Sequence, residues 1–295
     1  MDSALVAQVR RFNRTVTQRV GALEDAYLAG GRPLGQARVL WEIGPDGTEV
    51  RALRSRLDLD SGYLSRLLRA LTAEGLVTVR TDGGDARVRT AHLTAAGRAE
   101  RAELDRRSDD LATSILAPLN DRQRARLVGA LTEAEQLLVA SMVHVDVVDP
   151  RRRDARHCLQ AYFAELAERF EGGFEPAQTM PADAADLTAP AGLFLVATLH
   201  AEPVGCGGLK LHPAGYADVK RMWVAAGSRG LGLGRRLLAE LEARATDHGV
   251  HTLRLETNRA LTEAIGLYRA AGFREVPAFN PEPYAHHWFE KPLPR

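Results

Sequence analysis

The stretch Arg229-Gly230-Leu231-Gly232-Leu233-Gly234-Arg235-Arg236-Leu237-Leu238 is the most informative part of this sequence. It lies between a strand predicted at residues 217–224 and a helix predicted at residues 233–248. A glycine-rich turn at the start of a helix leaves several backbone N–H groups free at the positive helix end. Its three glycines let the backbone approach a ligand closely, and its arginines add positive charge. The stretch therefore predicts a phosphate-binding site.

Two common nucleotide-binding motifs do not match this stretch. A P-loop ends in Gly-Lys followed by Ser or Thr, and the stretch contains no lysine. A Rossmann fingerprint has the spacing G-x-G-x-x-G and opens the first βαβ unit of its domain. Here the glycines follow the spacing G-x-G-x-G, after a strand deep inside the predicted domain. The phosphate site therefore belongs to another class.

The segments around the glycine turn indicate which class. The pattern Arg229-x-x-Gly232-x-Gly234 resembles the coenzyme A signature of the GNAT acetyltransferases. Residues 218–224 resemble the fourth strand of that family, residues 253–258 its fifth strand, and residues 264–273 the following helix and Gly-Phe turn. The resemblance spans roughly residues 151–293. It implies an α/β fold with a mixed central sheet, acetyl-CoA as cosubstrate, an amine as acceptor and no metal.

The family's functional residues carry over by position. The resemblance implies that the following residues bind the cofactor: Met222, Val224, Arg229, Gly230, Leu231, Gly232, Leu233, Gly234, Arg235, Asn258 and Tyr268. Three of them are implied to be catalytic. The Val224 N–H would polarise the thioester carbonyl, Asn258 would hydrogen-bond the cofactor near the reacting end, and Tyr268 would protonate the departing thiolate.

Several alternatives stay open in this half of the sequence. Tyr268 has a structural alternative as a core aromatic on an amphipathic helix, and Cys206 is interpreted as a small buried strand residue rather than a nucleophile. The candidate bases are Asp218, Glu256, His286 and His287, or a chain of water molecules. No motif identifies the acceptor, so aminoglycosides, polyamines, amino acids and protein termini all remain candidates.

The first half of the chain is predicted to be mostly helical. A helix at residues 61–74 places its leucines on one side and polar residues on its other faces. Two strand patterns follow at residues 76–80 and 87–91, joined by a turn that contains Gly83 and Gly84. A helix with one apolar side and a short polar side, followed by a hairpin, is typical of a winged helix-turn-helix that enters the major groove of DNA.

This region resembles the MarR family of transcriptional regulators over about residues 1–145. The resemblance is carried by the segment Leu53–Leu76, above all by the stretch from Gly62 to Val77, and by Asp85-Ala86-Arg87 and Leu93-Thr94-Ala95-Ala96-Gly97. It implies a homodimer, formed through the terminal helices, that binds a pseudo-palindromic site in double-stranded DNA. The DNA-binding residues are then Ser61, Tyr63, Ser65, Arg66, Arg69 and Arg87. For Arg87 the alternative is a salt bridge to Asp82 or Asp85, and the domain itself has an alternative as a scaffold that no longer binds DNA.

Length and charge agree with two domains. The chain has 295 residues, enough for two ordinary cores, and Asp149-Pro150-Arg151-Arg152-Arg153 is the best boundary. We therefore expect a mostly α winged helix-turn-helix domain at residues 1–147 and an α/β GNAT domain at residues 148–295. The net charge of +1 hides a basic region, because eight arginines and five acidic residues lie between Arg51 and Arg89.

Other features of composition exclude some classes of protein. The two cysteines, Cys158 and Cys206, are far apart in the sequence, which argues against a disulfide framework or a cysteine-based zinc site. No run of about 18 apolar residues occurs, so we expect no membrane partner. The start of the sequence lacks the apolar core of a signal peptide, and we expect a cytoplasmic protein.

The sequence leads to one main hypothesis and two alternatives. In the main hypothesis, the protein is an acetyl-CoA-dependent N-acetyltransferase fused to a MarR-like DNA-binding regulator of transcription. In the first alternative, the GNAT-like domain senses acetyl-CoA or another ligand without turnover. In the second, the enzyme is active and the DNA-binding domain is vestigial and serves only for dimerisation.

Overall fold

The computed structural model describes residues 2–20, 31–81, 88–180 and 182–294, and the chain forms two compact units, Met1–Leu131 and Thr132–Arg295. Each unit has its own hydrophobic core. Among the described residues, no helix is both long and apolar enough to cross a membrane.

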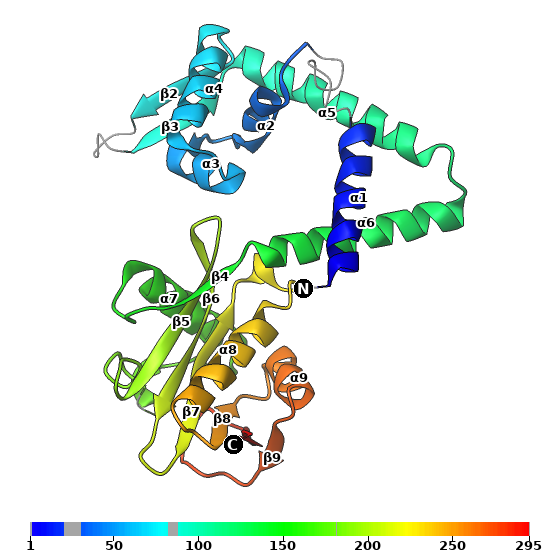
Figure 1. Ribbon diagram of the computed structural model, residues 1–295. Helices are drawn as coiled ribbons and strands as arrows, with labels where there is room; N and C mark the ends of the chain where they lie inside the picture. Colours follow the sequence, from blue (N-terminus) through cyan, green and yellow to red (C-terminus); the bar gives the residue numbers. More distant parts are fainter. Residues whose placement is uncertain (1, 21–30, 82–87, 181, 295) are drawn as a thin grey trace. The chain divides into compact units, whose positions relative to one another are not determined.

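The first unit combines helices with a small antiparallel sheet (Figure 1). Its helices are α1 (Ser3–Arg19), α2 (Leu34–Glu42), α3 (Val50–Leu57), α4 (Ser61–Ala73) and α5 (Ala95–Leu116). Helix α6 (Asp121–Ser141) begins in the first unit and ends in the second. Strands β1 (Thr48–Glu49), β2 (Val77–Thr81) and β3 (Arg89–Leu93) pair in the order β1-β3-β2. The predicted order of helices followed by a hairpin is confirmed.

Helix α4 forms because its cap and its apolar spacing agree. The Asp60 side chain accepts a hydrogen bond from the Tyr63 backbone N–H at 2.8 Å, which caps the first turn. The predicted leucine face is buried and packs with α2 and with the sheet. The members of this face are Leu64, Leu67, Leu68 and Leu71. The opposite side of α4 is left to polar residues.

Some details of the first unit differ from the predictions. The sequence predicts Thr48 as the N-cap of a helix that carries Val50, Leu53 and Leu57. Thr48 instead lies in β1, where its Oγ1 accepts from the Gly44 N–H at 2.9 Å and donates to the Glu42 carbonyl at 3.2 Å. Glu49 is the N-terminal flanking residue of α3 and makes no side-chain cap. The long first helix is described from Ser3 to Arg19 only. The wing tip and Arg87 lie outside the described residues.

The second unit is built on a mixed sheet of seven strands, in the order β4-β5-β6-β7-β8-β10-β9. Its strands are β4 (His144–Val147), β5 (Gly192–Leu199), β6 (Glu202–Leu211), β7 (Tyr216–Val224), β8 (Thr252–Thr257), β9 (Arg274–Val276) and β10 (His287–Pro292). All neighbours are antiparallel except the parallel pair β7 and β8. The predicted mixed central sheet is confirmed.

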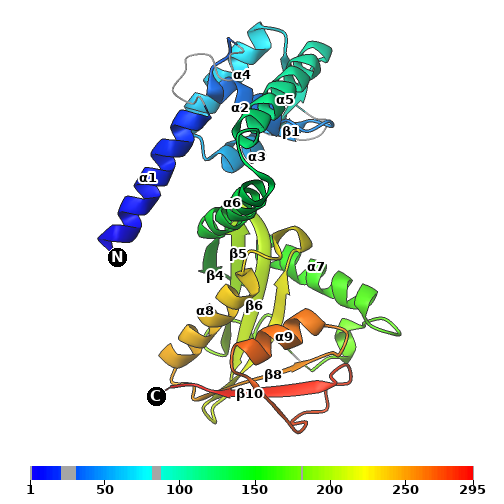
Figure 2. The ribbon, with the colours of Figure 1, turned by 90° about the vertical axis from the view of Figure 1, so that its right-hand side faces the viewer.

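Helices cover both faces of this sheet. They are α7 (Arg153–Arg169), α8 (Leu233–Asp247) and α9 (Thr262–Ala270). Strand β5 alternates between the faces, because Leu193 and Leu195 pack in the core of α8 and α9, whereas Phe194 and Val196 pack with Cys158 of α7. Figure 2 shows α7 and α8 on the two sides of β5 and β6. The sheet therefore has a layer of helices on each of its two faces.

Two features of this unit depart from the sequence-based picture. Strand β4 pairs with β5, so the sheet begins at His144, upstream of the break expected at residues 149–153. The segment His144–Val147 follows a helix without a glycine or proline signal, which is why the pattern did not separate it. The two cysteines, distant in sequence, lie in one buried core, where the Cys158 thiol donates to the Gly205 carbonyl at 3.6 Å and the Cys206 thiol to the Arg221 carbonyl at 3.2 Å.

Candidate functional site

Strands β7 and β8 separate at one end of the sheet. Their pairing runs only from Tyr216↔Thr252 to Asp218↔Arg254. Beyond that point β7 keeps β6 as a neighbour, and the Ala225 N–H donates to the Val204 carbonyl at 2.9 Å. Because bonding alternates along an antiparallel pair, the N–H of Val224 points away from β6 and into the opening. The separation thus exposes unpaired main chain.

A groove of about 500 Å³ lies at this opening, and we call it the wide groove. It is lined by Met222, Val224 and the glycine turn, with α7 and α9 forming its other walls. Gly230 and Gly232 both have left-handed backbones, with φ of 85° and 72°, and Gly232 flanks the start of α8. An added Cβ would meet nothing within 4 Å at either glycine, so conformation and not space requires glycine there.

The glycine turn presents a row of free backbone donors. The first helical bond of α8 at this end runs from the Arg236 N–H to the Gly232 carbonyl, at 3.0 Å. Within the part of the chain that the structure describes, no backbone carbonyl accepts from the N–H groups of residues 230–235. Free N–H groups at the positive end of a 15-residue helix suit a phosphate or pyrophosphate.

Arg229 is engaged by an acidic residue at the rim of the wide groove. Its guanidinium lies 2.6 Å from each carboxylate oxygen of Glu165 and also donates to the Val224 carbonyl at 3.2 Å. Glu165 accepts in addition from Arg169 at 3.1 Å and from the Trp223 indole at 3.0 Å. Burial alone would raise the pKa of Glu165, but these hydrogen bonds bring it below its ordinary value. Arg229 thus connects the glycine turn to α7 at the rim of the wide groove. Arg235 is exposed and also lines the groove.

A second, smaller space of about 90 Å³ adjoins the wide groove, and we call it the narrow cavity. The two spaces share six lining residues: Tyr162, Leu166, Met222, Leu261, Ala264 and Tyr268. These six side chains are therefore walls of both spaces. This junction is where a group could pass between two bound molecules.

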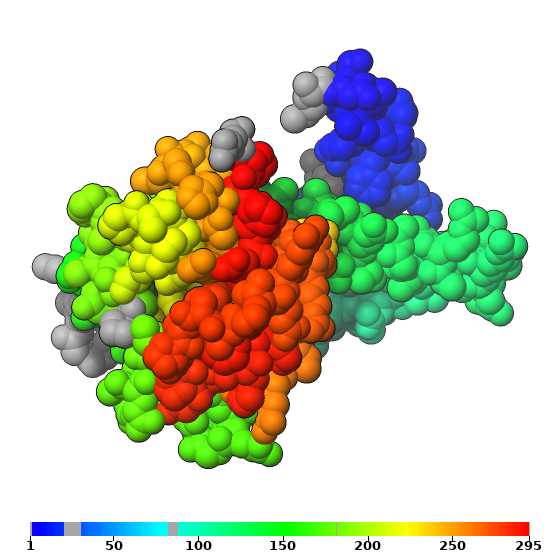
Figure 3. Space-filling model, turned by 90° about the horizontal axis from the view of Figure 1, so that it is seen from below, coloured from blue at the N-terminus to red at the C-terminus, as the bar shows by residue number. Residues whose placement is uncertain are grey.

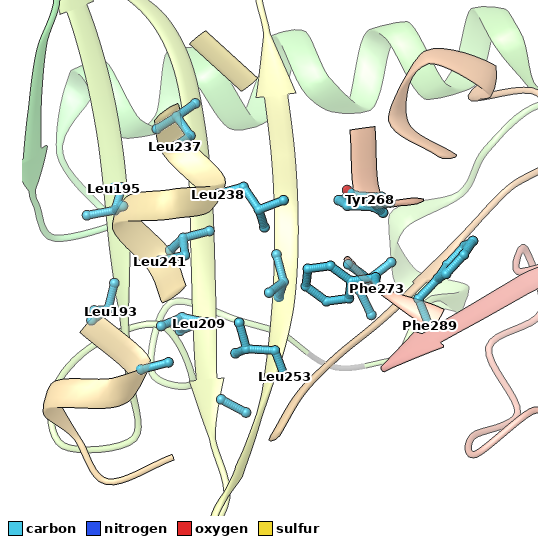
Figure 4. Close-up of a cluster of buried hydrophobic side chains, with 14 of the residues drawn as sticks. Leu193, Leu195, Leu209, Leu237, Leu238, Leu241, Leu253, Tyr268, Phe273 and Phe289 are labelled. Carbon is cyan, nitrogen blue, oxygen red and sulfur yellow. The ribbon is translucent and has the colours of Figure 1, made fainter. Parts of the chain in front are cut away.

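Tyr268 carries the polar group suited to chemistry at this junction. Its ring is 6% exposed and lies 5.9 Å from the Phe273 ring and 6.2 Å from the Phe289 ring (Figure 4). Its hydroxyl has no hydrogen-bond partner among the described residues. Burial raises the pKa of Tyr268 well above its ordinary value, with smaller contributions from Tyr162 and Glu256. The hydroxyl therefore keeps its proton at neutral pH and is free to donate it.

Asn258 lies in the narrow cavity and is bonded on both sides of its amide. Its Nδ2 donates to the Tyr284 carbonyl at 2.7 Å, and its Oδ1 accepts from the Ala260 N–H at 2.9 Å. These bonds fix the connection between β9 and β10 against the start of α9. The residues after about 250, drawn orange to red, form a continuous surface seen from below (Figure 3).

The four candidate bases separate by location. Glu256 lines the narrow cavity, forms a buried ion pair with Lys220 and accepts from Asn280 at 3.3 Å. Asp218 is bonded to His212 at 2.9 Å, and His287 to Glu275 at 2.6 Å. None of Asp218, His286 and His287 lines either space.

Two residues that line these spaces were not singled out from the sequence. Tyr162 of α7 lines both spaces, and Arg221 of β7 lines the narrow cavity. Burial raises the pKa of Tyr162 to about 12, although Arg221 beside it acts in the opposite direction. The sequence signal for Tyr162 is only its place among apolar residues of an amphipathic helix, and Arg221 has no signal beyond its charge.

The first unit offers a separate candidate surface on α4. Ser61, Tyr63, Arg66 and Arg69 are exposed there and Ser65 is half-buried. The Arg66 guanidinium lies 5.5 Å from the Tyr63 ring, and the Arg69 side chain donates to the Ser65 carbonyl at 3.3 Å. Neither arginine forms an ion pair with any residue in the described ranges, so both charges are available to phosphates.

Comparisons with known proteins agree with both halves. The model of the acetyltransferase (GNAT) family matches residues 159–273. An IAA acetyltransferase of Azospirillum brasilense is 37% identical over 134 residues, which cover 44% of this chain and 87% of that protein. The chain belongs to the GNAT acetyltransferase family. Its second unit is thus a GNAT acyltransferase domain, and the model of the MarR family matches residues 31–88, ahead of it.

Two solved structures are similar to parts of this GNAT protein. A GNAT-family acetyltransferase from Staphylococcus aureus is 18% identical, covers 51% of this chain and all of its own, and has a TM-score of 0.44. A probable transcriptional regulator from Pseudomonas aeruginosa is 24% identical, covers 44% of this chain and 98% of its own, and has a TM-score of 0.38. The fusion of a MarR-like segment to a GNAT domain, expected from the motifs, is confirmed.

Across the described ranges, no group of three or more His, Cys, Asp or Glu side chains is placed to hold a metal ion.

Proposed function

We propose that this protein transfers an acetyl group from acetyl-CoA to a small amine, and that its MarR-like domain binds double-stranded DNA. The observation that carries the enzymatic part is the junction of the two spaces at Tyr268, whose buried hydroxyl has no partner among the described residues. The wide groove suits the cofactor, because it offers free N–H donors for a pyrophosphate, and the narrow cavity suits the amine.

Main-chain groups would hold the cofactor. The N–H groups of residues 230–235 bind the pyrophosphate, and backbone groups of Met222 and Val224 that face the opening pair with the pantetheine arm. Asn258, bonded to the loop before β10, orients the reacting end from the narrow cavity. Bound acetyl-CoA supplies an acetyl group on a thioester, a bond that an amine can attack directly.

The side chains at the junction would carry the proton transfers. The Val224 N–H polarises the thioester carbonyl. Tyr268 donates its proton to the departing sulfur, which its raised pKa permits up to alkaline pH. Glu256 is assigned as the acceptor of the amine proton, because it alone of the four candidate side chains lines the narrow cavity.

Calorimetry and CoA release test the enzymatic proposal. Acetyl-CoA should bind the full chain, and a panel of amines should include one that releases free CoA. Binding without release across a broad panel would favour the alternative in which the domain senses acetyl-CoA. Failure of both binding and release would reject the acetyltransferase.

DNA binding and dimerisation are proposed together for the first unit. Helix α1 buries no residue in the single chain and leaves Leu5, Val9 and Phe12 at least 40% exposed, as a helix that pairs with a second copy would. Light scattering of the full chain should therefore give twice the mass of one chain. A protein that uses acetyl-CoA and binds chromosomal DNA is expected in the cytoplasm.

A gel shift with DNA from upstream of the protein's own coding sequence tests the operator. The shift should weaken steeply with salt, because phosphate contacts release counterions. The double variant Arg66→Ala, Arg69→Ala should lose it. The matched control is Arg153→Ala, Arg156→Ala, which removes two exposed arginines of α7. Absence of a shift with the unmodified chain would instead indicate a vestigial DNA-binding domain, and equal binding by both variants would show that α4 does not carry the contact.

A further inference from the structure

A β-bulge in β7 brings two consecutive basic side chains to the narrow cavity. Cys206 lies opposite Trp223 and Gly208 opposite Lys220, so Gly207 alone faces both Arg221 and Met222. Consecutive strand residues normally point to opposite faces of a sheet. Arg221 has a left-handed backbone with φ of 57°, which breaks this alternation. Lys220 and Arg221 consequently both line the narrow cavity.

The two cations differ in their partners. Lys220 is paired with Glu256, and each of these side chains is only 9% exposed. Arg221 is half-buried and forms no ion pair with any carboxylate of the described residues. Its polar contacts are neutral: Thr179 Oγ1 at 3.5 Å and the Tyr162 hydroxyl. A partly desolvated guanidinium without a counter-charge favours an anionic group that enters the cavity.

Aromatic rings hold the Arg221 side chain in place. Its guanidinium carbon lies 5.0 Å from the centre of the Phe163 ring and 6.0 Å from that of Tyr162. The Arg221 carbonyl accepts from the Cys206 thiol at 3.2 Å, which fixes the bulge itself. The aromatic rings thus hold the guanidinium, and the thiol holds the backbone of the same residue. A guanidinium fixed in this way is suited to bind a carboxylate with two hydrogen bonds.

The charges of the narrow cavity argue against a polycationic acceptor. Its carboxylates are Glu256, already paired with Lys220, and Glu282, which accepts from the backbone N–H groups of Met180 at 2.7 Å and Tyr284 at 3.3 Å. Two cations thus face two anions. A polyamine or an aminoglycoside would require an excess of carboxylates, whereas a zwitterion matches this balance.

The remaining wall of the cavity is apolar and aromatic. The rings of Phe170, Phe174 and Tyr284 lie within 4.9–5.9 Å of one another and all line the cavity. Its volume of about 90 Å³ is small beside the 500 Å³ of the wide groove. The cavity therefore suits a compact molecule with an apolar group.

We propose that the acceptor is a free α-amino acid with an apolar side chain, whose carboxylate is bound by Arg221. This proposal rests on the acetyltransferase function above. The α-nitrogen forms a bond to the acetyl carbon and the carbon–sulfur bond breaks. The zwitterion's α-ammonium group first loses one proton to solvent, which leaves the neutral amine that attacks. The proton that this amine loses during the transfer goes to Glu256, the departing sulfur takes its proton from Tyr268, and solvent restores both groups. The apolar side chain rests against Phe170, Phe174 and Tyr284.

Matched series of acceptors test the proposal. CoA release is measured with L-phenylalanine, L-leucine, L-methionine and L-tryptophan, each beside its amide and its decarboxylated amine. The proteins are the unmodified chain, Arg221→Asn, Arg221→Lys and the control Arg156→Gln on exposed α7 surface. Asparagine is chosen because it tolerates a left-handed backbone better than other non-glycine residues.

At least one free amino acid should exceed its amide and its amine in kcat/KM by about tenfold or more. Arg221→Asn should lower that value by about 10- to 100-fold, mainly through KM, and leave the amide unchanged. Arg221→Lys should keep part of the preference, and Arg156→Gln all of it. Acetyl-CoA should bind all four proteins with the same Kd, which also verifies that the variants fold.

Three results would overturn the proposal. One is an amide or amine that is acetylated as well as every free amino acid. Another is an equal loss for all acceptors in Arg221→Asn. The third is a protein that binds acetyl-CoA yet acetylates none of the amino acids. A protein that neither binds acetyl-CoA nor releases CoA would instead be the failure of the proposed acetyltransferase.

Discussion

The wide groove and the narrow cavity meet at Tyr268, yet they are built in opposite ways. The wide groove depends on main-chain groups of one continuous segment, residues 228–235, and of the end of β7. The narrow cavity depends on side chains from α7, from residues 174–180, from β7 and β8, and from the loop before β10. A site made of backbone is set by conformation, whereas a site made of side chains is set by which residues are present. Substitutions should therefore separate cofactor binding from acceptor choice.

Tyr268→Phe should have the largest effect, because this residue belongs to both spaces. Removal of the hydroxyl should lower kcat by about 100- to 10,000-fold, the usual range for a general acid. The Kd for acetyl-CoA and the thermal stability should hardly change, since the hydroxyl bonds to none of the described residues. Tyr216→Phe, outside both spaces, is the control. An active Tyr268→Phe variant would mean that another group or solvent protonates the sulfur.

The buried ion pair of the narrow cavity should dominate stability. Lys220→Met leaves the Glu256 carboxylate buried without a partner, which should lower the free energy of unfolding by about 3–5 kcal/mol. Lys220→Met combined with Glu256→Gln should recover most of that loss. Urea unfolding followed by tryptophan fluorescence measures both. Equal losses in the single and double variants would show that the pair is not what holds this wall.

The two spaces also differ in how far the sequence predicted them. The glycine turn, the α8 start at Leu233 and a strand at residues 253–258, which the structure has at Thr252–Thr257, were all predicted, because glycine spacing, periodicity and short motifs are local properties. Arg229 was predicted at the phosphates, but its pairing with Glu165 of α7 is a contact across 64 residues of sequence that no local pattern reports.

The lining of the narrow cavity could not be predicted from the sequence, for a physical reason. The position of Arg221 depends on a bulge, and a bulge is defined by the register of β6 against β7. The aromatic wall depends on a chain segment between α7 and β5 reaching the loop before β10, as the Phe174–Tyr284 contact shows. The bulge and the aromatic wall both depend on tertiary structure, which local sequence patterns do not report. The short strands β4 and β9 were missed because three or four residues give too little periodicity.

Gly232→Ala tests the backbone-built space directly. Alanine in this left-handed position should cost about 1–2 kcal/mol although it meets no neighbouring atom. If the turn shifts to relieve that strain, its N–H groups move, and the Kd for acetyl-CoA should rise about tenfold while the choice among acceptors stays the same. The control is Gly227→Ala, because Gly227 has no positive φ and open space around it. A change in acceptor preference would contradict the separation.

Tyr284→Phe is the mildest test and applies to the side-chain-built space. The phenol accepts from the Glu175 N–H at 3.0 Å and donates to Gln178 at 3.3 Å, so its loss should cost about 0.5–1.5 kcal/mol while the ring stays in the aromatic wall. The loop that carries this ring should loosen, and KM for the best acceptor should rise about two- to tenfold. The Kd for acetyl-CoA, measured by calorimetry, should not move, because Tyr284 does not line the wide groove. A rise in that Kd as large as the rise in KM would mean that the two spaces respond as one, and that the backbone of the groove depends on the wall of the cavity after all.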